Sequence, residues 1–141
     1  DACLDSCLAA TCGDGFLQQR LAYRSYLGVE LLAPAVERAA SHADDRTRFA
    51  QGDIQTFVPD EEFDVVIFNS SLCYLDVPVD AVLNAERCLS AGGYVIVGVW
   101  DQLYRNRRIL KALERVRPAI DATQVRNELG MTWTVRVHRV L

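Results

Sequence analysis

The sequence predicts one α/β domain built on a mostly parallel β-sheet, and three observations carry this prediction. Short apolar runs alternate with segments of helical periodicity, which is the pattern of βαβ units. One run, residues 63–68, is apolar apart from a single acid and suits a central strand buried on both faces. Glycines or polar residues follow several of the runs, at the edge where open α/β sheets bind ligands.

Seven strands are expected along the chain. Their predicted ranges are residues 6–10, 26–30, 48–51, 63–68, 94–100, 119–125 and 133–140. Apolar and polar residues alternate in the last range, so we expect that strand to be antiparallel and near an edge. Residues 128–130 supply the tight connection that precedes it.

Helical periodicity fills the gaps between the strands. A helix is expected directly after residues 12–15, a second over residues 33–43 and a last one over residues 106–116, before Pro118. Another begins near Val79, is expected to include Leu89, and should end at Gly92-Gly93, because glycine is a common C-terminal helix signal.

Composition narrows the class of function. The 141 residues make one domain, and a net charge of -4 gives no overall attraction to nucleic acid or to an anionic membrane, so a small-molecule substrate is favoured. No run reaches the roughly 18 apolar residues of a membrane span, and residues 1–5 lack a basic start, so we expect a cytoplasmic protein.

The five cysteines do not predict a metal site. Three lie within ten residues, but no C-x-x-C pair is present and the two histidines are far away in sequence. We therefore expect reduced, mostly buried thiols. Six basic residues in the range 105–117 are interpreted as a solvated helix face, with contact to an anionic substrate as the alternative.

Several segments resemble a known family. They are Cys12-Gly13-Asp14-Gly15, Gly28-Val29-Glu30, Gly52-Asp53, residues 63–69, residues 72–75 and residues 92–97. Together they resemble the small class I S-adenosylmethionine-dependent methyltransferases, and the resemblance covers nearly the whole chain. It implies a three-layer Rossmann-like fold whose sheet has seven strands, six of them parallel and the last one inserted antiparallel.

Under this resemblance, two of the segments bind opposite parts of the cofactor S-adenosylmethionine. Amide hydrogens at Gly13, Asp14 and Gly15 would bind the methionine carboxylate at a helix start, although glycines there can also make a simple turn and Asp14 can be a cap. Glu30, followed by Leu31, would accept hydrogen bonds from both ribose hydroxyls.

The remaining expected contacts follow the next two strands. Asp53 would accept from the adenine amine while the backbone of Ile54 contacts a ring nitrogen, although Gly-Asp is also an ordinary turn. Asn69 would emerge near the methionine part or the substrate, unless it is only a cap. The expected reaction is an in-line transfer of the methyl group, in which Asp101 or Tyr74 could take a proton from a hydroxyl nucleophile.

Two departures from the family pattern bear on activity. Ala9 stands where the first strand of relatives usually has an acid, and Thr11 stands where the loop usually has its first glycine. The single domain, residues 1–141, also begins close to the first strand, without the N-terminal lid helices of many relatives. We therefore expect either an open site or a lid supplied by another subunit, as in a homodimer.

Three other functions are alternatives. The strongest alternative is a catalytically impaired binding or scaffold protein that keeps the methyltransferase fold, since Ala9 and Thr11 weaken the expected site. A nucleic-acid methyltransferase is less favoured, because Asn69-Ser70-Ser71-Leu72 replaces the Asn/Asp-Pro-Pro-aromatic segment of the amino-methylating types. A nicotinamide-dependent dehydrogenase would need glycine where Gln18 stands.

Overall fold

The computed structural model describes residues 4–10, 15 and 17–140, and its seven strands form one sheet in the order β3-β2-β1-β4-β5-β7-β6. The strands are β1 Leu4–Ala10, β2 Tyr23–Glu30, β3 Thr47–Gln51, β4 Phe63–Asn69, β5 Leu89–Trp100, β6 Asp121–Arg126 and β7 Thr132–Arg139. β7 is antiparallel to both of its neighbours, and the other pairs are parallel. The predicted sheet is confirmed, and β4 is its central strand.

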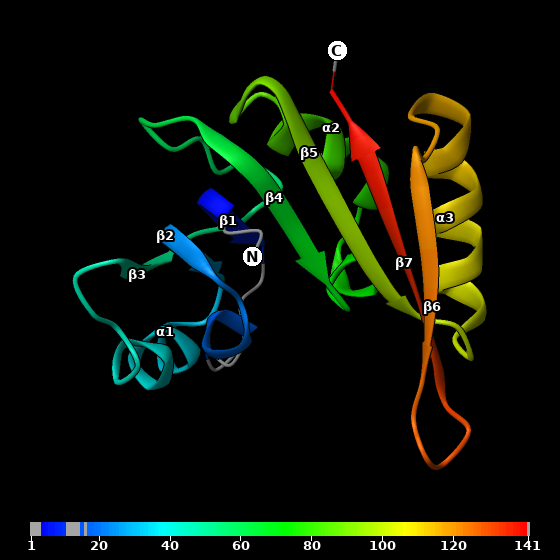
Figure 1. Ribbon diagram of the computed structural model, residues 1–141, viewed down its shortest axis with the longest axis horizontal. Helices are drawn as coiled ribbons and strands as arrows, with labels where there is room; N and C mark the ends of the chain where they lie inside the picture. Colours follow the sequence, from blue (N-terminus) through cyan, green and yellow to red (C-terminus); the bar gives the residue numbers. More distant parts are fainter. Residues whose placement is uncertain (1–3, 11–14, 16, 141) are drawn as a thin grey trace.

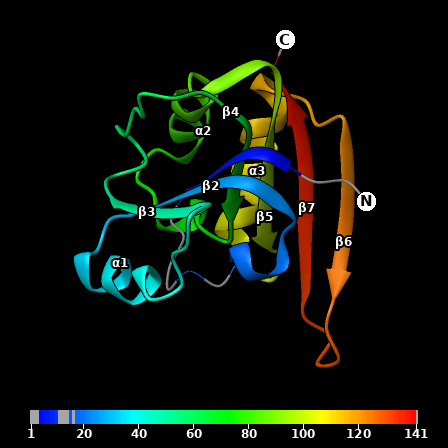
Figure 2. The same ribbon diagram turned by 60° about the vertical axis from the view of Figure 1, so that its left-hand side comes forward.

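Helices cover the two faces of the sheet unequally. The helices are α1 Ala33–Ala40, α2 Pro78–Glu86 and α3 Tyr104–Val116, with short 3-10 helices η1 Leu17–Arg20 and η2 Leu72–Tyr74. α2 and α3 lie on one face, while α1 packs beside β2 and β3 at the far end of the sheet (Figures 1 and 2). The layers of the expected three-layer fold are therefore present.

The larger hydrophobic core lies between the sheet and the α2–α3 layer. It includes Phe63, Val66 and Phe68 of β4, Val82 of α2 and Leu113 of α3, all of them fully buried. A smaller cluster occupies the opposite face, around Cys7, Ala9, Tyr23, Tyr26, Val65 and Ile67. β4 contributes to both clusters because successive side chains of a strand point to opposite faces. This explains why its sequence is an almost continuous apolar run.

The prediction for the helix before β5 was wrong at its end. α2 ends at Glu86, and Leu89 already pairs with Phe63 as the first residue of β5. Gly92 and Gly93 lie inside β5, where the register against β4 shifts and Gly92 has a φ of +78°. A β-carbon on Gly93 would lie 3.0 Å from the backbone oxygen of Asp64. The glycine pair therefore permits an irregularity within a strand and does not end a helix.

The helix expected after residues 12–15 is also shorter than predicted. Within the described residues it consists of the 3-10 helix η1, Leu17–Arg20. β2 begins at Tyr23, which pairs with Leu4 at the start of β1. The strand is therefore three residues longer at its start than the predicted range 26–30. Only residues 11–22 remain to cross between the two parallel strands, close to the dozen or so that such a crossover needs.

Candidate active site

A pocket of about 540 Å³ lies at the carboxyl ends of β2, β3 and β4, and we call it the rim pocket. Its lining residues are Glu30, Leu31, Leu32, Gly52, Asp53, Ile54, Gln55, Asn69, Ser70, Ser71, Tyr74, Leu75 and Asp76. The structure thus gathers five of the expected cofactor contacts, Glu30, Leu31, Asp53, Ile54 and Asn69, in one cavity. Parallel strands bring these residues together because their carboxyl ends share one edge of the sheet.

Glu30 is the last residue of β2 and its carboxylate is held in place by the chain that follows. Its Oε1 accepts hydrogen bonds from the amides of Leu31, at 2.9 Å, and Leu32, at 3.4 Å. These amides lie just before α1, where a helix dipole also stabilises negative charge. Leu31 and Leu32 themselves are exposed apolar side chains on the pocket wall. An acid and an apolar surface therefore stand side by side.

Gly52 fixes the approach of the β3 end to the β2 end. Its amide donates to the backbone oxygen of Glu30 at 2.9 Å. A β-carbon at Gly52 would lie only 2.7 Å from Cδ2 of Phe57 and 3.4 Å from Cγ1 of Val29. Glycine has no side chain and therefore allows this close turn. The turn brings Asp53 to the same pocket as Glu30.

Only one of the two carboxylate oxygens of Asp53 is hydrogen-bonded within the described residues. Its Oδ1 accepts from the amide of Gln55 at 2.9 Å and from Gln55 Nε2 at 3.4 Å, whereas Oδ2 has no partner among the described residues. Asp64, at the opposite end of the sheet, contrasts with it: both of its oxygens accept hydrogen bonds, from Ser6 and Ser90. Those bonds hold the pKa of Asp64 below its ordinary value. Asp64 is thus structural, while Asp53 keeps an acceptor for a ligand.

Gln55 is a pocket residue that the sequence did not point to. Its Oε1 accepts from the amides of Asp76, at 3.1 Å, and Val77, at 3.2 Å, and its Nε2 donates to Asp53. One side chain therefore ties the segment after β3 to the segment before α2. The two amides that donate to its Oε1 lie more than twenty positions away in sequence, so no local pattern could have identified this link.

The segment after β4 combines an unusual backbone with a buried hydroxyl. Ser70 has a φ of +54°, a left-handed conformation that is uncommon outside glycine, and its amide donates to the oxygen of Gly98 at 2.8 Å. Ser71 is only 2% exposed, and its Oγ has no hydrogen-bond partner among the described residues. Strained backbone and an unsatisfied buried hydroxyl both concentrate at functional sites. Asn69, before them, lines the same pocket and is exposed.

Tyr74, one of the two expected proton acceptors, lies on the wall of the rim pocket. It is the last residue of η2, its amide donates to the oxygen of Ser71, and 83% of the residue is exposed. An exposed aromatic ring at the mouth of a pocket can cover a ligand and exclude water from it. Its role in catalysis stays a prediction.

Three expected cofactor contacts are not brought to the rim pocket by the described structure. Gly13 and Asp14 lie outside the described residues, as does the departure at Thr11. Gly15 has a φ of +79°, and a β-carbon there would lie 2.9 Å from Cβ of Ala39 in α1. Close packing against α1 therefore explains Gly15 without a ligand.

Asp101, the other expected proton acceptor, lies in a different cavity, beside α3 and β7. Its Oδ2 accepts from Gln124 Nε2 at 2.9 Å. Partial burial acts to raise the pKa of Asp101, but hydrogen bonds from Thr134, Gln124 and Thr132 outweigh it and hold the pKa below its ordinary value. A carboxylate with a lowered pKa is a weaker base. In addition, Asp101 does not line the rim pocket.

The described residues offer no group of three or more side chains suited to a metal ion, and none of the described helices is long and apolar enough to cross a membrane. Cys7, Cys73 and Cys88 are free thiols, while Cys3 and Cys12 lie outside the described residues. Burial raises the pKa of the Cys7 thiol to about 12. That thiol is therefore a structural element of the smaller core.

Comparison with known proteins identifies both a family and a fold. Residues 8–97 match the model of a family described as a methyltransferase domain. No match is found among curated proteins. N-methyltransferase NodS from Bradyrhizobium japonicum WM9, solved with S-adenosyl-l-homocysteine, is 19% identical, with a TM-score of 0.83 over 98% of this chain and 79% of that one.

Two further structures show how widely the fold is used. An S-adenosylmethionine-dependent methyltransferase from Mesorhizobium loti is 15% identical, with a TM-score of 0.75 over 97% of this chain and 91% of that one. The [4+2]-cyclase SpnF is 16% identical, with a TM-score of 0.78 over 99% and 76%. These likenesses concern the fold, and the family follows from the match over residues 8–97. On that evidence the chain belongs to the class I S-adenosylmethionine-dependent methyltransferases.

Proposed function

We propose that this protein binds S-adenosylmethionine with the adenosine part in the rim pocket and transfers the methyl group to a small-molecule acceptor. One observation supports the proposal: Glu30, Asp53 and Asn69 line the same pocket. The three residues end or follow β2, β3 and β4, which belong to one sheet with β1 between β2 and β4, so their relative positions are set by the sheet.

The residues present fit an adenosine. The Glu30 carboxylate suits the paired ribose hydroxyls, and Asp53 Oδ2 suits the exocyclic amine of adenine. Leu31 and the buried Ile54 supply apolar surface for the base. The unpartnered hydroxyl of Ser71 is a further polar atom that a ligand would satisfy. A volume of about 540 Å³ lies within the range of about 300–1,000 Å³ that is usual for small-molecule sites.

In the proposed reaction, the protein mainly positions the acceptor molecule against the cofactor and shields both from water. When bound, the cofactor supplies an already activated methyl group, so the protein needs no strong nucleophile of its own. Asn69 offers an amide donor and acceptor at the end of β4, where an acceptor molecule would be oriented. Tyr74 lines the pocket and is exposed, so its ring could shield the bound cofactor from water, or its hydroxyl could take a proton from the acceptor molecule.

A small molecule is the acceptor class that the charge favours. A chain with a net charge of -4 does not attract nucleic acid as a whole, and the segment after β4 reads Asn69-Ser70-Ser71-Leu72. NodS is itself named as an N-methyltransferase, which shows that this fold carries transfer to nitrogen in a similar protein.

The second candidate is a binding protein with impaired catalysis. Ala9 is buried between Gly28 and Ile67 and leaves no carboxylate near the carboxyl end of β1. SpnF has a similar fold and is named as a [4+2]-cyclase, so the fold alone does not imply methyl transfer. Cofactor binding without methyl transfer is the result that this candidate predicts.

Isothermal titration calorimetry separates these candidates. We expect one site for S-adenosylmethionine and for S-adenosylhomocysteine and no binding of NAD. Methyl-labelled cofactor should then transfer label to the small-molecule fraction of a cell extract, and not to its nucleic acid. Binding without any transfer would favour the impaired candidate, and a folded protein that binds neither adenosyl compound would overturn the proposal.

A further inference from the structure

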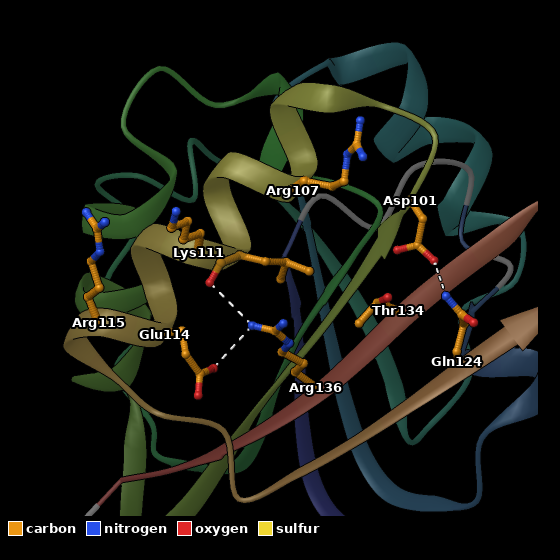
Figure 3. Close-up of a pocket in the computed structure, with 9 residues that line it drawn as sticks. Asp101, Arg107, Lys111, Glu114, Arg115, Gln124, Thr134 and Arg136 are labelled. Carbon is orange, nitrogen blue, oxygen red and sulfur yellow. Dashed lines mark hydrogen bonds and ion pairs between the residues drawn. The ribbon is translucent and has the colours of Figure 1, made fainter.

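A second cavity, of about 660 Å³, lies between α3 and the strands β6 and β7, and we call it the α3 cavity (Figure 3). Its lining residues are Asp101, Arg107, Leu110, Lys111, Glu114, Arg115, Gln124, Thr134 and Arg136. None of these residues lines the rim pocket. The proposed methyl transfer therefore makes no use of this cavity.

The charge of the α3 cavity is opposite to that of the whole chain. Four basic side chains line it against two carboxylates, although the chain carries a net charge of -4. Arg107, Lys111 and Arg115 recur every four residues along α3, so they form one stripe on the helix, with a rise of about 6 Å between successive members. Like charges at this spacing repel one another, and an anion between them would remove the repulsion.

The stripe is not neutralised by the protein. Within the part of the chain that the structure describes, the side chains of Lys111 and Arg115 form no hydrogen bond or ion pair, and the Arg107 guanidinium lies over the ring of Tyr104, 5.7 Å from its centroid. Glu114 is the one acid between them on the helix, and it is paired with Arg136. The positive charge of the stripe is therefore available to a ligand.

Arg136 of β7 forms the floor of the cavity and is the most enclosed of its cations. Its side chain is 26% exposed, and its Nη1 donates to the oxygen of Leu110, at 3.4 Å, and to Glu114 Oε2, at 3.2 Å. Among the described residues, no partner is found for its Nε or Nη2. A guanidinium that is anchored on one side and open on the other presents a donor edge suited to a phosphate.

The far side of the cavity has the opposite chemistry. Figure 3 shows Asp101 hydrogen-bonded to Gln124 next to Thr134, away from Lys111 and Arg115. The Asp101 carboxylate is charged at neutral pH, as an aspartate ordinarily is, so it repels an anion and accepts from hydroxyl groups. Its hydrogen bonds hold its pKa lower still. A ligand of uniform negative charge would meet repulsion there. A ligand with an anionic end and a hydroxylated end would not.

We propose that the α3 cavity binds a small phosphorylated molecule that carries hydroxyl groups, of the chemical class of the sugar phosphates. The phosphate lies between Arg136 and the stripe formed by Arg107, Lys111 and Arg115, and a ligand hydroxyl donates to Asp101. This site shares no residue with the rim pocket, so the proposal does not rest on where the cofactor binds.

The test is calorimetry of the full chain with ribose 5-phosphate, inorganic phosphate and ribose as probes. The double variant Lys111→Gln/Arg115→Gln removes two exposed cations of the cavity. The matched control, Arg87→Gln/Arg108→Gln, removes two exposed cations that do not line it. Circular dichroism melts and binding of S-adenosylhomocysteine report whether each variant is folded.

We expect ribose 5-phosphate to bind more tightly than inorganic phosphate, and ribose not to bind. The cavity variant should lose roughly tenfold in affinity for ribose 5-phosphate, from two exposed ion pairs, while the control changes less than about twofold. Asp101→Asn should remove the preference for ribose 5-phosphate over inorganic phosphate. Equal losses in the cavity and control variants, absence of saturable binding, or a preference that survives in Asp101→Asn would overturn the proposal.

Discussion

The rim pocket and the α3 cavity are of similar size and are built in opposite ways. In the rim pocket, the polar side chains of Glu30, Asp53 and Gln55 are each fixed by hydrogen bonds to neighbouring backbone amides. In the α3 cavity, three of the four cations are exposed and held by no ion pair within the described residues. The first site is organised before a ligand arrives, and the second attracts its ligand by charge.

This difference teaches what each site can discriminate. Fixed acceptors at set positions reject a ligand that lacks the matching donors, because an unmet buried group carries a full desolvation cost. Mobile cations in water accept any anion of suitable size and depend on ionic strength. The rim pocket is therefore suited to one cofactor. The α3 cavity is suited to a class of ligands.

The largest expected effect is on the rim pocket, from Glu30→Ala. Loss of hydrogen bonds to a charged group should weaken S-adenosylhomocysteine binding by about 1.5 to 3 kcal/mol, or about 10- to 150-fold. Calorimetry measures this change directly. Glu37→Ala removes an exposed acid from α1 that does not line the pocket, and it should leave the affinity unchanged. If both variants bind equally well, Glu30 has no contact with the ligand.

Several residues of the rim pocket could be grouped from the sequence because they follow strands. Glu30 ends β2, Asp53 follows β3 and Asn69 ends β4, so finding the strands was enough to bring these side chains to one edge. The close approach at Gly52 was not predicted, because Gly-Asp is also an ordinary turn and the contact with Phe57 is visible only in the structure. The expectation of seven strands in one sheet, six parallel and the last inserted antiparallel, came from the resemblance to a family, because periodicity alone does not pair strands; the strand order was not predicted.

What could not be predicted depends on contacts between distant segments. Gln55 acts on Asp76 and Val77, and the α3 cavity exists only because β7 packs against α3. The six basic residues of the range 105–117 were visible in the sequence. The sequence did not show that three of them line a cavity together with Arg136 of β7. Gly92-Gly93 was misplaced for the same reason: pairing with β4 outweighed a local helix-end signal.

A smaller effect on the rim pocket is expected from Gln55→Ala. This change removes the acceptor for the amides of Asp76 and Val77 and one donor to Asp53. Affinity for S-adenosylhomocysteine should fall about fivefold to tenfold, because each net hydrogen bond is worth about 0.5 to 1.5 kcal/mol. Hydrogen exchange at the amides of Asp76 and Val77 should become faster. Gln102→Ala, in the loop after β5, is the matched control, and slower or unchanged exchange in Gln55→Ala would contradict the positioning role.

Ser71→Ala should change stability and affinity in opposite directions. Removing a buried hydroxyl that has no partner among the described residues should raise the free energy of unfolding by up to about 1 kcal/mol, since an unsatisfied group is costly. If a ligand satisfies that hydroxyl, affinity should fall by about threefold. Thermal melts with and without S-adenosylhomocysteine measure both quantities. A variant that is less stable and binds normally would show that Ser71 is a packing residue only.

The smallest expected effect distinguishes the two cavities without any mutation. Raising the ionic strength from about 0.01 M to about 1 M shortens the Debye length from about 30 Å to about 3 Å. S-adenosylhomocysteine has no net charge at neutral pH and meets acceptors already fixed by backbone amides, so its affinity should change by less than about twofold over this range. Binding of ribose 5-phosphate to the exposed stripe of α3 should weaken steadily with salt. Titrations of both ligands over the same salt range test this difference. If both affinities respond equally to salt, the α3 cavity does not bind its ligand mainly by exposed charge.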